Sequence, residues 1–119
     1  MSNQSVTASV EAWISAWNSR DLEAIMSHYA EDVVFEAQTV AKRWNKPNGK
    51  LYGRDELRKH FELGLQLAPQ IHFTLEQIFL APSGYSVVYA RENGNRVVDS
   101  VRLDSDGLAK DVVAYYAAK

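Results

Sequence analysis

The sequence contains no cysteine, only three prolines and six glycines, and no long run of apolar residues. Without cysteine the chain cannot form a disulfide, offer a thiolate nucleophile or build a zinc–thiolate site. No apolar run approaches the roughly 18 residues that a membrane-spanning helix needs. The polar start Met1–Ser5 lacks the charged and apolar regions of a signal peptide. These absences lead us to expect a cytoplasmic protein that has no membrane partner.

What is present is the composition of an ordinary folded domain. Among 119 residues, 46% are hydrophobic, 11% aromatic and 24% charged, which is typical of a soluble globular protein. The length is close to the commonest domain size, so we expect a single domain over residues 1–119. A net charge of −2 and a pI near 5.9 argue against a general nucleic-acid-binding protein.

Charge is distributed unevenly along the chain. Residues 42–59 carry seven basic side chains and two acidic ones, whereas residues 1–41 carry one basic and six acidic side chains. The basic stretch contains no repeat and little aromatic interleaving. We interpret it either as a solvated face of the fold or as a segment that attracts an anionic ligand or partner.

Three amphipathic helices are predicted from the spacing of apolar residues. The first covers about residues 6–17, and the third covers about residues 54–67 and is ended by Pro69. The second begins after Asp21, a good N-cap residue. Its apolar face is predicted to carry Leu22, Ile25, Met26 and Tyr29.

Strands are predicted where β-branched and aromatic residues concentrate or alternate with polar ones. A short strand over 33–37 is followed by an irregular loop over 38–52 with a turn at 47–49. Four further strands follow the third helix, at about 71–80, 85–92, 96–103 and 108–117. This order predicts an α+β protein whose helices cover one face of a curved, mostly antiparallel sheet.

The pair Asn93-Gly94 is a strong hairpin signal between two of these strands. A two-residue turn there pairs Val88 with Asp99, and a turn one residue later pairs Val88 with Val101. Both registers place all three side chains on the same face, which we assign to the interior. The opposite face is also apolar, so we expect a second copy of the chain to cover it in a homodimer.

Four separated motifs follow the pattern of one superfamily of small α+β proteins. They are Trp17-Asn18-Ser19-Arg20-Asp21-Leu22-Glu23-Ala24-Ile25-Met26, Tyr29-Ala30-Glu31-Asp32-Val33-Val34-Phe35, Gly53-Arg54-Asp55-Glu56-Leu57, and Asp106-Gly107 separated by seven residues from Tyr115-Tyr116. On these motifs the chain resembles the SnoaL-like polyketide cyclases of the NTF2-like superfamily, which are relatives of the ketosteroid isomerases. The resemblance implies a cone-shaped α+β barrel with about three N-terminal helices and an apolar pocket inside.

Asp99 is the first catalytic candidate. It lies in mid-strand among apolar neighbours on the predicted interior face, where a carboxyl group must be paired, hydrogen-bonded or protonated. The resemblance implies that Asp99 matches an aspartic acid that donates to a developing enolate in ketosteroid isomerases. The structural alternative is that Asp99 bonds a hydroxyl, an indole or water, or reaches solvent at the pocket mouth.

Other positions that carry chemistry in those enzymes hold different residues here. By the resemblance, Ala37 stands where the isomerases have their general base, and Trp13 where they have a tyrosine of the oxyanion hole. Ala114 stands where some cyclases and epoxide hydrolases have an acid. Classical ketosteroid isomerisation and the water-activating hydrolase mechanism are therefore not expected. This leaves a catalyst with one acid, a catalyst with a different base, or no catalyst.

His60 is the second catalytic candidate, because it lies between Leu57 and Phe61 on a predicted helix and histidine titrates near neutral pH. Its neighbours Arg58 and Lys59 favour a histidine on the helix surface instead. The three histidines of the sequence show no spacing typical of metal ligands. We therefore expect no metal and no cofactor.

The predicted pocket combines large aromatic side chains with small and aliphatic ones, which leaves room near Asp99 for a small apolar molecule. We expect an isomerase- or cyclase-like catalyst acting on a carbonyl-bearing ligand. The alternative is a non-catalytic ligand-binding or dimerisation module. The expected lining consists of Trp13, Trp17, Tyr29, Phe35, Ala37, Phe61, Val88, Val101, Val112, Ala114 and Tyr116.

Overall fold

The computed structural model describes residues 3–118. Within this range the chain forms four helices and six strands. The helices are α1 (Asn3–Asn18), α2 (Leu22–Met26), α3 (Gln38–Trp44) and α4 (Arg54–Leu67). The strands are β1 (Tyr29–Glu36), β2 (Lys50–Tyr52), β3 (Thr74–Ala81), β4 (Gly84–Ala90), β5 (Arg96–Leu103) and β6 (Ala109–Tyr116).

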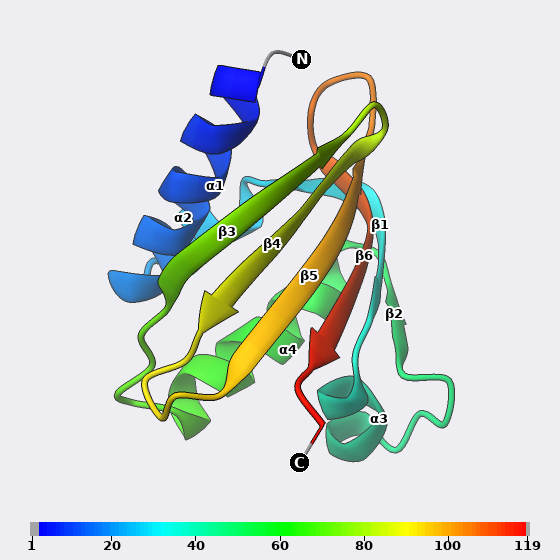
Figure 1. Cartoon of the computed structure of the whole chain (residues 1–119). Coiled ribbons are helices and arrows are strands. Elements are labelled where there is room, and N and C mark those ends of the chain that lie inside the picture. The colour runs from blue at the N-terminus through cyan, green and yellow to red at the C-terminus, as the bar shows by residue number, and fades with distance from the viewer. Residues whose placement is uncertain (1–2, 119) are drawn as a thin grey trace.

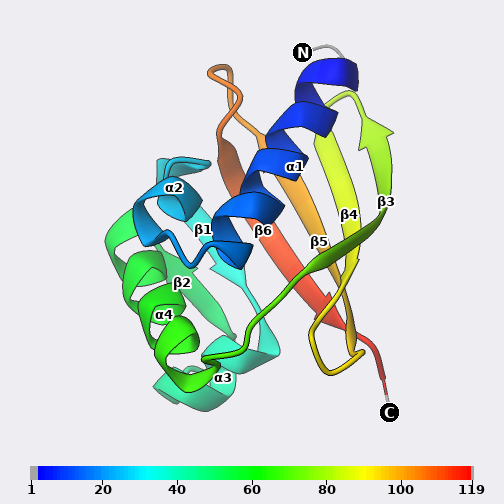
Figure 2. The same ribbon diagram turned by 90° about the vertical axis from the view of Figure 1, so that its left-hand side faces the viewer.

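All six strands belong to one curved, unclosed sheet in the order β2-β1-β6-β5-β4-β3. Only β1 and β6 pair in parallel; the other neighbours are antiparallel. The helices α1, α2 and α4 lie on one face of the sheet (Figures 1 and 2). The predicted α+β class, the three predicted helices and the mostly antiparallel sheet are therefore confirmed.

The segment after α1 ties three parts of the fold together through side-chain hydrogen bonds to backbone. The Asn18 amide accepts a bond from Phe73 N at 2.7 Å and donates one to Phe73 O at 2.9 Å, which fixes the chain just before β3. The Arg20 guanidinium donates to the carbonyls of Leu65 and Ala68 at the end of α4. These carbonyls have no partner within the helix, so Arg20 acts as a cap.

The second helix is shorter than its apolar pattern predicts. Asp21 caps it as expected, because its carboxylate accepts a bond from Ala24 N at 3.1 Å. The helix ends at Met26, however, and Tyr29 is the first residue of β1 rather than part of a helix face. Tyr29 pairs with Ala109 of β6, so strand pairing outweighs the local helical periodicity.

The segment over 38–52, predicted as irregular, contains both α3 and β2. The helix buries only Val40 completely and ends at Asn45, whose backbone is left-handed with φ 53°. One buried residue in seven gives almost no periodic signal, which is why the sequence pattern does not reveal this helix. Strand β2 adds to the edge of the sheet by pairing with β1, where Leu51 lies opposite Phe35.

Both predicted registers of the β4–β5 hairpin are wrong, the nearer one by a single residue. The connecting loop has five residues, 91–95, instead of two, so Val87 pairs with Asp99 and Val88 pairs with Val98. An odd loop length reverses which side chains share a face. Val88 therefore lies on the face opposite Asp99, and the predicted inward position of Val88 is corrected. Tyr89, with 6% of its surface exposed, faces the interior instead.

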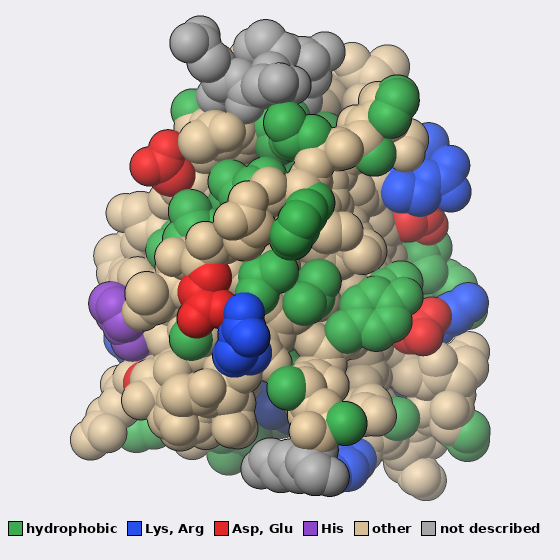
Figure 3. Space-filling view, in the orientation of Figure 1, with side chains coloured by type: hydrophobic (Ala, Val, Ile, Leu, Met, Phe, Trp, Pro, Cys, Tyr) green, Lys and Arg blue, Asp and Glu red, His purple; other side chains and the backbone are tan. Residues whose placement is uncertain are grey.

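The core fills the space between the helices and the inner face of the sheet. Its most completely buried side chains include Ile25, Leu57 and Val33. On the outer face, Phe79 and Tyr115 are 58% and 56% exposed, and Figure 3 shows hydrophobic side chains gathered over the strands there. Within the described residues, no helix is both long and apolar enough to cross a membrane.

Candidate functional site

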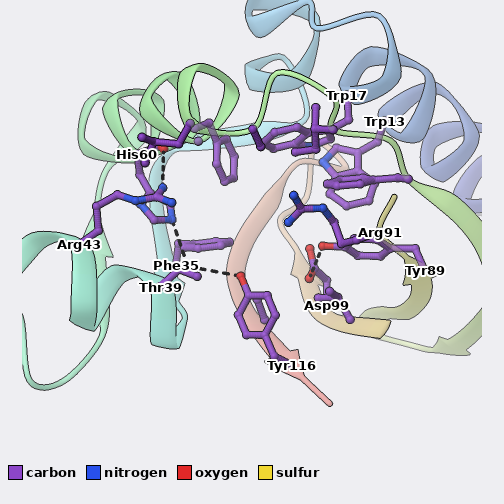
Figure 4. Close-up of a pocket in the computed structure, with 18 residues that line it drawn as sticks. Trp13, Trp17, Phe35, Thr39, Arg43, His60, Tyr89, Arg91, Asp99 and Tyr116 are labelled. Carbon is purple, nitrogen blue, oxygen red and sulfur yellow. Dashed lines mark hydrogen bonds between the residues drawn. The ribbon is translucent and has the colours of Figure 1, made fainter. Parts of the chain in front are cut away.

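A pocket of about 130 Å³ opens between the helices and the inner face of β4, β5 and β6 (Figure 4). Most of its wall is apolar, and the large rings pack against one another at centroid distances of 4.4–5.6 Å. The aromatic part of the wall consists of Trp13, Trp17, Phe35, Phe61, Phe73 and Tyr89. The polar part consists of Thr39, Arg43, His60, Arg91, Asp99 and Tyr116.

Asp99 projects from the middle of β5 and is only 4% exposed. Burial raises the pKa of its carboxyl group from 3.8 to about 7, although a hydrogen bond from the Tyr89 hydroxyl, 3.3 Å from Oδ1, lowers it. Desolvation has this effect because it penalises the charged carboxylate more than the neutral acid. Near neutral pH this side chain can therefore either give up or take up a proton.

The negative charge of Asp99 raises the pKa values of four tyrosine side chains, in addition to the larger effect of their burial. Burial, followed by the Asp99 charge, raises the pKa of Tyr85 to about 12, and the same two causes raise the pKa values of Tyr29 and Tyr89 well above 10.0. Burial also raises the pKa of Tyr116. These phenols consequently remain protonated near neutral pH and act as hydrogen-bond donors, not as bases.

Behind Asp99, a second, much smaller cavity of about 10 Å³ lies on the side away from the main pocket. Tyr29, Tyr85 and Val101 contribute to its wall, together with Trp13 and Asp99. The Trp13 indole N–H donates to the Tyr29 hydroxyl at 2.9 Å, so the indole position is fixed from this side. A cavity of this size has room for about one water molecule.

His60 is buried, contrary to the helix-surface interpretation, with 4% of its surface exposed. The Trp44 indole N–H donates to His60 Nδ1 at 2.9 Å, so the ring proton of neutral His60 lies on Nε2. Nε2 is 3.4 Å from the Thr39 hydroxyl, which is 3.3 Å from the Tyr116 hydroxyl. A chain of polar groups therefore runs from α3 and α4 into the pocket (Figure 4).

Burial, followed by the positive charge of Arg43, lowers the pKa of His60 from 6.5 to about 4. We expect NMR of the ring nitrogens to show neutral His60 with the proton on Nε2 from pH 8 down to about pH 5, one unit above this pKa. Arg43→Gln should move the titration midpoint upward, because it removes the nearby positive charge. A midpoint near 6.5 in the unaltered protein would contradict this geometry.

The structure brings together six of the eleven residues predicted to line the pocket, along with both catalytic candidates. Tyr29 and Val101 instead contribute to the small cavity behind Asp99. Ala37 borders a separate surface hollow next to α3, and Val112 is buried in the core. Those in the pocket are Trp13, Trp17, Phe35, Phe61, Ala114 and Tyr116.

The predicted lining omits five polar or aromatic residues of the pocket wall: Thr39, Arg43, Phe73, Tyr89 and Arg91. Thr39 and Arg43 lie four residues apart on α3, a spacing that places both on one helix face, but the sequence pattern predicts a loop for this segment. The predicted hairpin register places Tyr89 on the opposite face of the sheet. Arg91 falls within the strand predicted over 85–92, whereas the structure places it in the loop over 91–95. Correct secondary structure would have revealed the first pair.

Two further observations bear on what the pocket can hold. The buried indole N–H of Trp17 has no hydrogen-bond partner among the described residues, so an acceptor atom on a bound molecule would compensate its desolvation. No group of three or more histidine, aspartate or glutamate residues within the described part of the chain is arranged to bind a metal ion.

In a comparison with known families, residues 10–112 match the SnoaL-like domain. No protein among those with curated descriptions matches the sequence significantly. A SnoaL-like protein of unknown function from Burkholderia thailandensis has the same fold, with a TM-score of 0.93 at 23% identity and 99% coverage of both chains.

Two similar structures contain small molecules. TerC, co-crystallised with polyporic acid, gives a TM-score of 0.75 at 15% identity, with 93% of this chain and 90% of that chain covered. Rv0760c from Mycobacterium tuberculosis, in complex with estradiol-17β-hemisuccinate, gives a TM-score of 0.71 at 16% identity, with 94% of this chain and 93% of that chain covered. At these identities the likeness establishes a common fold.

Proposed function

Since the chain belongs to the SnoaL-like domain family, we propose that it binds a small, mainly apolar molecule in the pocket beside Asp99. We further propose that Asp99 exchanges a proton with a carbonyl-bearing ligand, in an isomerase- or cyclase-like reaction. The observation that carries this proposal is the buried Asp99 carboxyl group at the wall of an aromatic pocket, with a pKa of about 7.

The binding part of the proposal is supported by the character of the wall. Trp13, Trp17 and Phe73 present large rings to the pocket, and Ala114, the neighbour of Asp99 across β5 and β6, occupies little volume. Apolar walls with a few polar groups are typical of small-molecule sites. Two proteins of similar fold were crystallised with small molecules, which agrees with this use of the fold.

The chemical part is supported by the environment of Asp99. A base or acid works best when its pKa lies close to the working pH, and burial brings Asp99 there. The protonated Tyr89 hydroxyl contacts Asp99 and can stabilise its carboxylate, the form that accepts a proton from the ligand. His60 does not act as a base in this proposal, because its Nδ1 lone pair already accepts a bond from the Trp44 indole. Its Nε2, which carries the ring proton, is a hydrogen-bond donor.

A non-catalytic binding module is the second candidate function. Ala114 favours it, because this direct neighbour of Asp99 provides no second carboxyl group. A single acid can move a proton, but it has no partner to complete a two-residue acid–base mechanism. The two candidate functions predict different effects of Asp99→Asn on the rate of proton exchange of a bound carbonyl compound.

The proposal can be tested with β-tetralone, a small bicyclic ketone that has acidic α-protons. NMR in heavy water measures the rate at which these protons exchange with the solvent. We expect the protein to accelerate exchange above background, with a rate that rises with pH around a midpoint of about 7, because the carboxylate is the base. Asp99→Asn should remove the acceleration while changing ketone affinity by less than about tenfold. Ala114→Phe, which fills the pocket next to Asp99, should remove both binding and exchange.

The outcomes separate the candidates. Saturable binding without acceleration that depends on Asp99 would favour the non-catalytic module. Binding that survives Ala114→Phe would place the ligand outside this pocket and contradict both functions as formulated here. Acceleration retained in Asp99→Asn would exclude the proposed role of this carboxyl group.

Homodimerisation through the outer sheet face and a cytoplasmic location both stay predictions. The exposed rings of Phe79 and Tyr115 support the first, because large apolar patches commonly mark interfaces. Light scattering at tens of micromolar should give the mass of a dimer, about twice 13.4 kDa. Phe79→Asp should shift the mass to that of the monomer, and a monomeric unaltered protein would contradict the prediction.

A further inference from the structure

Positive charge dominates the polar part of the pocket wall. Arg43 comes from α3, on one side, and Arg91 from the loop between β4 and β5, on the other. Figure 4 shows the Arg91 guanidinium pointing into the space between these two sides. Both guanidinium groups act electrostatically on the Tyr116 hydroxyl and lower its pKa, against the larger effect of burial. Two cationic side chains from different elements thus line the same pocket.

Arg43 has no carboxylate within salt-bridge distance among the described residues. Its Nη1 instead donates to the His60 carbonyl at 3.2 Å and lies 3.4 Å from His60 Nδ1. Gly64 of α4 has no side chain, and a Cβ there would lie 3.6 Å from Arg43 Nη1. The guanidinium thus rests against α4, half-buried. Most of its five N–H donors have no acceptor among the described residues.

Arg91 is partly neutralised but remains oriented toward the pocket. Two of its nitrogens bond the Glu92 carboxylate at 2.9 and 3.1 Å, and its guanidinium carbon lies 5.8 Å from the centre of the Phe73 ring. These contacts hold the guanidinium in one place. Its other three N–H groups meet no acceptor in the part of the chain that the structure describes, so a ligand at the pocket wall can bind them.

The acidic side chain that lines the pocket does not offset these charges. Asp99 is the only carboxyl group among the residues of the wall, and it holds its proton through much of the range below neutral pH. Half-buried arginines next to an apolar wall favour a compact anion, because weak local screening strengthens the attraction. A neutral ligand would leave the Arg43 donors without acceptors.

We propose that the pocket selects ligands that combine an apolar ring system with one anionic oxygen group, which Arg43 and Arg91 bind while the rings lie against the aromatic wall. This inference deepens the proposed function by naming the ligand class, and it rests on that function's binding site. It also assigns Arg43, from the basic stretch at 42–59, a role in binding. Arg43 is here a specificity residue and takes no part in proton transfer.

The test compares β-naphthoate with β-naphthamide by isothermal titration calorimetry. The two molecules have the same rings and nearly the same shape, but only the first is an anion. We expect the carboxylate to bind more tightly by about tenfold or more, the value of one charge-assisted hydrogen-bond pair. Arg43→Gln should reduce this preference severalfold with little effect on the amide, and Arg43→Lys should retain most of it.

Arg102→Gln is the matched control. It removes the same charge from the outer face of β5, where Arg102 lies 3.8 Å from Asp111 and is 62% exposed. We expect it to leave the preference unchanged, which separates local recognition from the net charge of the protein. Ala114→Phe should abolish binding of both molecules if they occupy the pocket.

Each outcome bears on one of the two proposals. Equal affinity for both naphthalene compounds, unchanged by Arg43→Gln, would overturn the inferred ligand class and leave the proposed binding function standing. If Arg43→Gln and Arg43→Lys both weakened the binding of β-naphthoate and β-naphthamide by the same factor, Arg43 would only support the structure of the pocket. This result would also overturn the inference. Absence of binding by either compound to the unaltered protein would count against the pocket as a binding site.

Discussion

Asp99→Asn is expected to raise the free energy of unfolding by about 4 kcal/mol at pH 8 and to leave it nearly unchanged at pH 4. The carboxyl pKa rises from 3.8 to about 7 on folding, and each unit of such a shift corresponds to about 1.4 kcal/mol. Asparagine has almost the same shape and never ionises. It therefore removes the cost of placing a carboxylate in an apolar site.

The direction of the pH dependence follows from the number of protons bound to the folded and to the unfolded protein. Between pH 3.8 and about 7 the folded protein retains the Asp99 proton while the unfolded chain loses it. Stability from this group is thus fully present below pH 3.8 and declines as the pH rises toward 7. The unaltered protein should lose stability over this range more steeply than the variant.

Urea denaturation at a series of pH values measures this effect. Asp111→Asn provides the control, because it removes a carboxyl group that is 45% exposed on the neighbouring strand. That variant should keep the pH dependence of the unaltered protein. Parallel stability curves for the unaltered protein and Asp99→Asn would show that the carboxyl group is solvated, and would remove the main support for its role in proton transfer.

Gly84→Ala is expected to destabilise the fold by about 3 kcal/mol or more, although alanine is the smallest possible addition. Gly84 is the first residue of β4 and pairs with Arg102 of β5. A Cβ at this position would overlap the Val101 carbonyl oxygen and lie 2.9 Å from its carbonyl carbon. Because the obstructing atoms belong to the backbone, the strands must separate to make room.

Gly94→Ala is the matched comparison for this substitution. Gly94 lies in the 91–95 loop, where a Cβ would meet nothing within 4 Å, but its φ of 85° is unfavourable for alanine. We expect a cost of about 1 kcal/mol from this backbone strain. If urea denaturation gave the two alanine variants equal stability, the close approach of β4 and β5 at Gly84 would be excluded.

The same close approach explains why the register of this hairpin is so consequential for the site. The antiparallel pairing that begins with Gly84 opposite Arg102 places Val87 opposite Asp99 and turns Tyr89 toward the pocket. A slip of one residue would exchange Tyr89 for Val88 and remove the hydroxyl that bonds Asp99. Packing of the strands thus selects the polar partner of the candidate catalytic group.

By itself the sequence determined the elements whose signals are local. Periodic apolar residues predicted α1 and α4, Asp21 predicted the start of α2, and mid-strand Asp99 identified the buried acid. Together, the separated motifs also indicated the SnoaL-like family. These signals lie in residues close together in the sequence. Their spacing alone decides which face of a helix or strand is apolar.

The tertiary structure decided what depends on distant partners. Pairing with β6 drew Tyr29 out of the second helix, and the five-residue loop reversed the facing of Val88. Docking of α3 buried His60 under Trp44 and brought Arg43 to the pocket. No short stretch of sequence records such contacts, because their free energy arises only when segments far apart in the chain bury surface against each other.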